Sequence, residues 1–141
     1  MIKQISVFIE NKKGSLMRIT KVIAEAKIDI RALCIADTSD FGILRIIVDD
    51  EKKALEVLRS NGYIVSDTEV AAVQMSDKPG ALSAILETLY EENVSVEYTY
   101  AFLSKSGSDA FVVIRADDTE KAENILRAQG LHTIEKSEID K

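Results

Sequence analysis

Apolar and polar residues along the chain follow two different periods. Every second residue in 5–9 is apolar, which is typical of a half-buried strand. Apolar residues then recur at spacings of three and four through 16–26, which predicts an amphipathic helix. A β-rich segment at 28–36, a polar turn at 37–40 and an apolar segment at 42–48 together predict a hairpin.

A second predicted helix and a short strand complete this pattern. Asp50 is the expected N-cap of a helix over 51–61, and Gly62 stands where glycine commonly ends a helix. Residues 63–65 predict a closing strand. The order is therefore β-α-β-β-α-β, which is the order of the ferredoxin-like α+β fold, an antiparallel sheet with both helices on one face.

The whole pattern occurs twice. The segment 11–16, Asn-Lys-Lys-Gly-Ser-Leu, aligns with 77–82, Asp-Lys-Pro-Gly-Ala-Leu, at an offset of 66 residues. The offset becomes 68 later on, so the second copy has gained two residues between its second and third strands. Such a repeat indicates a duplicated folding unit, and we expect tandem domains at 1–68 and 69–141. The second copy predicts elements at 70–76, 80–91, 94–103, 109–116, 119–129 and 131–135.

The connection between the two copies, residues 66–69, is short and contains neither glycine nor proline. A ferredoxin-like sheet leaves one face without helices and leaves its edge strands open, which favours pairing with a neighbour. We therefore expect the two sheets to join edge to edge and two chains to stack as a homodimer.

The turn between the first strand and the first helix is the polar motif that both copies share. Gly14 or Gly80 allows a sharp turn, and the N–H groups that open the following helix can then bind a small carboxylate. Asn11 or Asp77 adds a side-chain oxygen, and an ionised Asp77 can pair with an ammonium group. Carboxylate and ammonium together describe an amino acid. The structural alternative is that Asn11 and Asp77 cap the helix and that each glycine only relieves a tight turn.

The sequence resembles the ACT domain family, whose βαββαβ units carry an Asn/Asp-x-Pro-Gly-x-Leu turn at this place. The segment 77–82 matches that turn fully, whereas 11–16 has Lys13 in place of the proline. The resemblance implies allosteric binding of an amino acid where the turn of one domain meets the second strand of its partner. The turn residues implied by position are Asn11, Gly14, Ser15, Leu16, Asp77, Gly80, Ala81 and Leu82. The second strands add Arg31, Leu33, Glu97 and Tyr98.

Three aromatic residues alternate along the second strand of the second copy: Tyr98, Tyr100 and Phe102. One interpretation is that they pack under the helices. If Tyr98 instead reaches the interface, with Glu97 nearby, histidine or an aromatic amino acid is the favoured ligand.

Composition narrows the function further. The 141 residues are 46% hydrophobic and 30% charged, with one cysteine and one histidine. Cys34 and His132 are therefore interpreted as structural, and we expect no disulfide, metal site, cofactor or catalytic residue. A net charge of −6 argues against nucleic-acid partners, and no segment has the length of a signal peptide core or a membrane span. A cytoplasmic location is expected.

Two functions remain open at this point. One is a non-catalytic sensor that binds a free amino acid and regulates amino-acid metabolism allosterically. The other is a protein–protein interaction module that tethers or regulates a separate metabolic enzyme or regulator and binds no small molecule. In either case the regulated protein is a separate chain.

Overall fold

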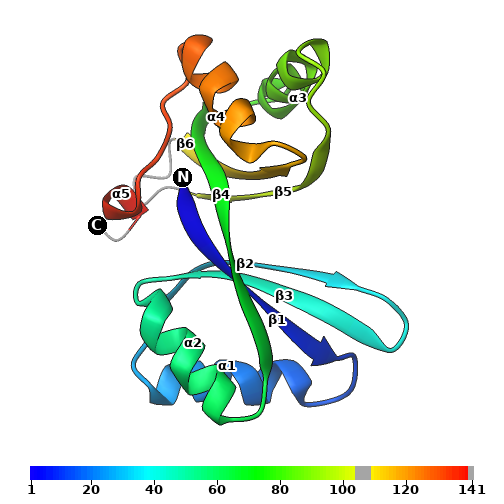
Figure 1. Ribbon diagram of the computed structural model, residues 1–141, viewed down its shortest axis with the longest axis vertical. Helices are drawn as coiled ribbons and strands as arrows, with labels where there is room; N and C mark the ends of the chain where they lie inside the picture. The colour runs from blue at the N-terminus through cyan, green and yellow to red at the C-terminus, as the bar shows by residue number, and fades with distance from the viewer. Residues whose placement is uncertain (104–108, 140–141) are drawn as a thin grey trace. The chain divides into compact units, whose positions relative to one another are not determined.

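The structure, a computed structural model, describes residues 1–103 and 109–139 (Figure 1). Two compact units are present: the first unit, Lys3–Thr68, and the second unit, Glu69–Lys141 with Met1–Ile2. Each unit combines antiparallel strand pairs with two helices of ten or eleven residues. The predicted α+β class is therefore confirmed.

The strands of the first unit follow the order β2-β3-β1-β4. β1 and β3 are antiparallel neighbours with Val7 opposite Leu44, and β2 pairs with the other side of β3. Helices α1 and α2 cover one face of this sheet (Figure 1). The arrangement is the predicted ferredoxin-like one. Its elements are β1 (Ile2–Glu10), α1 (Ser15–Glu25), β2 (Ile30–Asp37), β3 (Phe41–Val48), α2 (Glu51–Ser60) and the first residues of β4 (Ile64–Ser76).

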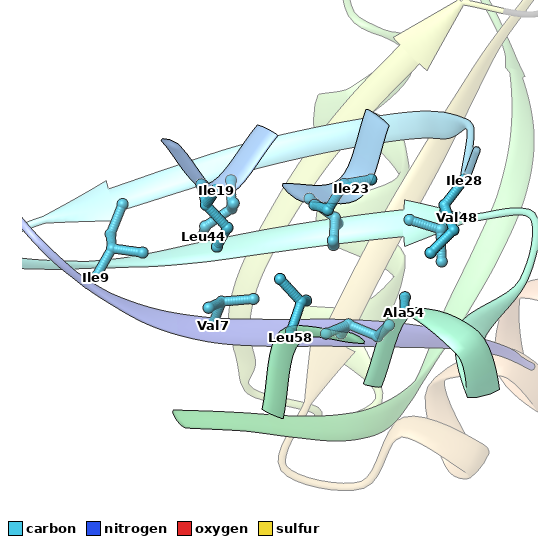
Figure 2. Packing of buried hydrophobic residues seen from close by; sticks show 11 residues of the cluster. Val7, Ile9, Ile19, Ile23, Ile28, Leu44, Val48, Ala54 and Leu58 are labelled. Carbon is cyan, nitrogen blue, oxygen red and sulfur yellow. The ribbon is translucent and has the colours of Figure 1, made fainter. Parts of the chain in front are cut away.

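The core of the first unit lies between the sheet and its two helices (Figure 2). Ile19 and Ile23 from α1 and Leu58 from α2 are fully buried, as are Val7 and Leu44 of the sheet. Residues three or four apart lie on the same side of a helix, so the spacing that predicted the helices is also what buries these side chains.

Helices α2 and α4 (Thr119–Ala128) each begin at an aspartate cap. A carboxylate oxygen of Asp50 accepts the N–H of Lys53 at 3.1 Å, and Asp118 accepts that of Lys121 at 3.0 Å. The cap expected at Asp50 is thus confirmed. Gly62 follows α2 with a φ of 85°, a left-handed conformation that suits glycine at a helix end.

In the second unit the strand order is β4-β6-β5, with Val73 of β4 opposite Val112 of β6. Helices α3 and α4 supply Leu89 and Leu126 to its core. None of the helices in the described residues is both long and apolar enough to cross a membrane. The further elements are α3 (Ala81–Glu91), β5 (Val96–Leu103), β6 (Asp109–Ala116), α4 and a short α5 (Lys136–Ile139).

The closing strand predicted at 131–135 is wrong. The chain there makes a single bridge to β4, between Thr133 and Val73, and the N–H of Ile134 donates to the carbonyl of Ala72 at 2.7 Å. One bridge is too little for a strand, and the chain turns into α5 directly afterwards. The two-residue gain predicted between the second and third strands of this copy lies outside the described residues.

β4 corrects a second prediction. The segments 63–65 and 70–76 were expected as separate strands joined by a connection at 66–69. Instead, residues Ile64–Ser76 form one strand of 13 residues. The expected domain boundary after residue 68 falls inside this strand, at the point where the two compact units divide.

The aromatic residues of β5 face away from the helices. Thr99 lies opposite Ile114, which is part of the core beneath α3 and α4. Because side chains alternate along a strand, Tyr98, Tyr100 and Phe102 point to the other face. The interpretation that they pack under the helices is wrong.

Candidate functional site

The turn between β1 and α1 presents free peptide donors. Gly14 has a φ of 88°, which is accessible to glycine without a Cβ penalty, and it precedes the first residue of α1. The N–H of Ser15 donates to the carbonyl of Lys12 at 3.1 Å and closes the turn. The first turn of a helix offers no acceptor for the next N–H groups, those of Leu16 and Met17. They therefore point beyond the helix start, where a small anion can bind them.

The same backbone occurs in the second unit. Gly80 also has a φ of 88°, and the N–H of Ala81 donates to the carbonyl of Lys78 at 3.3 Å. The surroundings differ, however. A Cβ atom added at Gly80 would meet nothing within 4 Å, whereas one at Gly14 would lie 3.0 Å from the guanidinium of Arg18. The glycine turn of the second unit is thus the more open one.

Asn11 and Asp77 do not cap these helices, so the structural alternative is wrong on this point. The caps are the two glycines, and neither helix has a side-chain cap bond. The carboxamide of Asn11 instead donates to the backbone carbonyl of Thr38 at 3.1 Å. The backbone N–H of Asn11 donates to the backbone carbonyl of Asp40 at 2.8 Å. Asn11 therefore fastens the turn to the hairpin between β2 and β3. Asp77 is exposed, and part of the corresponding hairpin lies outside the described residues.

A hollow of about 130 Å³ lies beside the first turn, and we call it the turn hollow. It brings together three of the predicted residues, Asn11, Ser15 and Leu16, with Ile35 and Asp37 from the end of β2. The rest of its lining comes from Ile9, Glu10, Lys12 and Gly42. Peptide donors, an amide and two carboxylates, those of Glu10 and Asp37, thus border one small space.

Ile35 and Asp37 were not among the predicted site residues. Ile9 of β1 lies opposite Gly42 of β3, and Gly42 lies opposite Asp37. The last residue of β2 is therefore level with the end of β1, where the turn begins. The predicted hairpin contained this signal, because the strand end next to the hairpin must lie at the same end of the sheet as the glycine turn.

Arg31 and Leu33 lie outside the turn hollow. They belong to the first half of β2, whose first residue, Ile30, is opposite Val48 at the other end of β3. Arg31 forms an ion pair with Asp29 at 3.0 Å, and Leu33 is half exposed. Taken by itself, the first unit does not bring these two residues to its own turn.

Glu97 and Tyr98 are likewise distant from the turn of their own unit. Leu103 of β5 and Met75 of β4 both lie opposite Ala110 of β6, so Leu103 is level with the end of β4. Asp77 follows directly after that strand. Tyr98 stands five positions earlier, roughly 16 Å along the strand. Glu97 forms an ion pair with Arg115 at 3.5 Å. Within the second unit, Glu97 and Tyr98 therefore do not lie at the glycine turn.

Two βαββαβ-type units, each with a glycine turn before its first helix, define the class of this protein. The chain belongs to the ACT domain pair family, whose sequence model matches residues 1–141. It is similar to protein BT0572 from Bacteroides thetaiotaomicron, with 39% identity and a TM-score of 0.90 over 99% of this chain and 96% of that one.

More distant structures share the fold. The regulatory subunit of aspartate kinase from Thermus thermophilus, in its ligand-free form, is 17% identical with a TM-score of 0.66. The corresponding subunit from Thermus flavus is 18% identical with a TM-score of 0.64. Each comparison covers 89% of this chain and 90% of the other. No curated protein matches the chain.

Proposed function

We propose that this chain is a non-catalytic regulatory protein that binds a free amino acid through its glycine turns. The observation that carries the proposal is the repeated turn, in which Gly14 and Gly80 adopt the same left-handed conformation before a helix. Peptide N–H groups at each helix start would bind the ligand carboxylate. Asp77 in the second unit, or Asp37 beside the turn hollow of the first, would pair with its ammonium group.

The proposed binding residues combine both turns with the second strands. In the paired-domain arrangement, the turn of one ACT domain, at 1–68 or 69–141, meets the second strand of another. That arrangement accounts for strand residues that lie far from the turn of their own unit. The set is Asn11, Gly14, Ser15, Leu16, Asp77, Gly80, Ala81 and Leu82 from the turns, with Arg31, Leu33, Glu97 and Tyr98 from the strands.

The comparisons support a regulatory role without catalysis. Two structures with the same fold are regulatory subunits of aspartate kinase, and one of them is described as ligand-free. A regulatory part that is separate from a catalytic chain is therefore compatible with this fold. We propose that this chain acts in the same manner, as a cytoplasmic homodimer whose contacts with a separate metabolic enzyme respond to the amino acid.

Histidine or an aromatic amino acid is the proposed ligand class. Tyr98, Tyr100 and Phe102 lie on the helix-free face of β5, next to a carboxylate at Glu97. Aromatic faces and a carboxylate together favour a planar or cationic ligand side chain.

A thermal-shift screen against the twenty amino acids at millimolar concentration tests the proposal. A ligand at about 100 times its dissociation constant stabilises the folded state by roughly 2.7 kcal/mol, which is several degrees in melting temperature. We expect one amino acid or a small group to respond, and the response to be lost in Asp77→Ala and Gly80→Val.

Gly130→Val is the matched control. Gly130 has a φ of 87° and open space around it, as Gly80 does, but it follows α4 and belongs to neither turn. It should lower the melting temperature as Gly80→Val does and keep the ligand response. A flat screen with the wild-type protein would contradict amino-acid sensing and favour the interaction module.

A further inference from the structure

A larger hollow adjoins the first turn, on the side of the connection between α2 and β4. Its volume is about 640 Å³, and we call it the Arg18 hollow. It shares Ile9, Glu10, Lys12 and Ser15 with the turn hollow, and the other six of its lining residues are different. Its charged residues are Arg18 and the ion pair of Lys12 with Glu10, and its large apolar and aromatic residues include Phe8, Phe41, Tyr63 and Ile64.

Its apolar wall is exposed to an unusual degree. Phe8 and Phe41 stack with their ring centroids 5.0 Å apart, yet each ring residue is 45% exposed. Ile64, at the start of β4, is 72% exposed. Three large apolar side chains thus line a concave surface instead of entering the core.

The second unit shows what the same fold carries when this wall is polar. Gln74 aligns with Phe8 and Asp109 aligns with Phe41, and these two side chains are hydrogen-bonded to each other. His132 aligns with Ile64. The fold therefore does not require apolar residues at these three positions, so their presence in the first unit calls for another explanation.

The charged part of the hollow differs between the units in the same way. Lys12 has a counterpart in Lys78, but Arg18 aligns with Ala84. The corresponding hollow of the second unit, whose lining includes Lys78 and Ala84, is also smaller, at about 300 Å³. The guanidinium of Arg18 has five N–H donors, and its hydrogen bond to the carbonyl of Lys13, at 3.5 Å, uses one of them.

We propose that the Arg18 hollow is a second binding site, for a small carboxylate that carries an aromatic or branched apolar group. Arg18 binds the carboxylate, and Phe8, Phe41 and Ile64 cover the apolar group. Lys12 is paired with Glu10 at 2.9 Å, so the guanidinium of Arg18 is the cation assigned to the ligand. The volume is within the range of small-molecule sites, and an apolar wall with a few charged groups is the composition of such sites. Because the apolar wall is concave and ends at an arginine, it fits a small carboxylate better than it fits the flat surface of a protein partner. The proposal does not depend on amino-acid binding by the glycine turns.

Titration with 3-phenylpropanoate and with L-phenylalanine, followed by ¹H–¹⁵N NMR, tests the site in the full chain. The backbone amide signal of Gly62, which lines the hollow, should shift when either probe is added. Acetate and glycine, which lack the apolar group, should bind at least about tenfold more weakly. Binding of both larger probes, or of phenylalanine alone, supports the proposal, and the second result restricts the ligand to amino acids.

The variants Phe8→Gln and Arg18→Ala install the residues that the second unit carries at these positions, so the fold should tolerate them. Each should weaken binding of 3-phenylpropanoate about tenfold, because one loses apolar contact and the other a charge-assisted hydrogen bond. Lys21→Ala, which removes an exposed cation from α1 outside the hollow, should leave binding unchanged.

Absence of binding at millimolar probe, or equal binding in wild type and both variants, would overturn the proposal. So would a Phe8→Gln variant that becomes monomeric in sedimentation without a change in probe binding, because the surface would then serve self-association. The proposed function is tested independently, by the amino-acid screen and by the variants at Asp77 and Gly80 in the second unit. Either proposal can therefore fail without the other.

Discussion

The carboxamide of Asn11, in the first glycine turn, is hydrogen-bonded to the carbonyl of Thr38, in the hairpin between β2 and β3, at 3.1 Å. The two residues are far apart in sequence, and the bond fixes one wall of the turn hollow against the other. Asn11 therefore contributes to the shape of the site as well as to its donors.

Replacing Asn11 with alanine should destabilise the protein by about 0.5–1.5 kcal/mol, because the hydrogen bond to the hairpin is lost. Chemical denaturation measures the change. Ser39→Ala keeps the peptide carbonyls of the hairpin and should be neutral. Equal effects of the two substitutions would mean that the Asn11 side chain does not hold the hairpin.

Asp50→Ala and Asp118→Ala should each cost about 1 kcal/mol in free energy of unfolding, since each removes the cap of an equivalent helix. Asp50→Asn retains an oxygen acceptor and should recover most of the loss. Denaturant titration of the three variants provides the comparison, and an asparagine as damaging as alanine would argue against capping.

Leu58→Ala and Leu126→Ala should each cost about 2–5 kcal/mol, because both side chains are fully buried in the cores of their units. Met17→Ala, at a residue that is 58% exposed, should stay within about 0.5 kcal/mol. Thermal and denaturant unfolding of all three would show whether burial sets the cost, and a Met17 variant as unstable as the others would contradict this.

Gly14→Ala and Gly80→Ala should each cost about 1–2 kcal/mol, because alanine is strained at a φ near 88°. Gly14→Ala should cost more, since its Cβ would approach the Arg18 guanidinium, whereas Gly80 has open space. A double-mutant cycle with Arg18→Ala isolates that contact. The excess should disappear when Arg18 is absent, and additive effects would show that the two residues do not interact.

The repeated element order could be predicted from sequence because its signals are local. Periods of two and of three to four identify strands and helices, and the cap at Asp50 and the glycine at Gly62 mark the ends of α2. The sequence also held evidence against a break at 66–69, inside β4, since this segment contains neither glycine nor proline. The expectation that each unit has its own strands concealed the continuous strand.

The orientation of β5 could not be predicted by counting alternate residues. The pairing register shifts between Val96 and Tyr98, and β2 shifts at the equivalent place, between Ile30 and Ala32. An irregularity of one residue turns every later side chain to the opposite face of the sheet. Such a shift depends on the pairing of strands and leaves no mark in the pattern of one strand.

The candidate site was predicted in part for a related reason. The turn residues Asn11, Ser15 and Leu16 form one contiguous motif, and the structure places them around one hollow. Ile35 and Asp37 join them only through the pairing of β1, β3 and β2, which a motif does not record. Phe8, Phe41 and Ile64 come from three strands, and only the alignment of the two copies distinguishes them from ordinary strand residues.

The continuous strand β4 also limits how this molecule can be taken apart. A cut or an insertion after Thr68 falls in the middle of a hydrogen-bonded strand and not in a loop, where such changes are usually tolerated. Such a cut would divide residues 64–68, which belong to the first unit, from residues 69–76, which belong to the second. The boundary between the two copies thus lies within one continuous strand, where an interruption costs strand hydrogen bonds that a loop would not have.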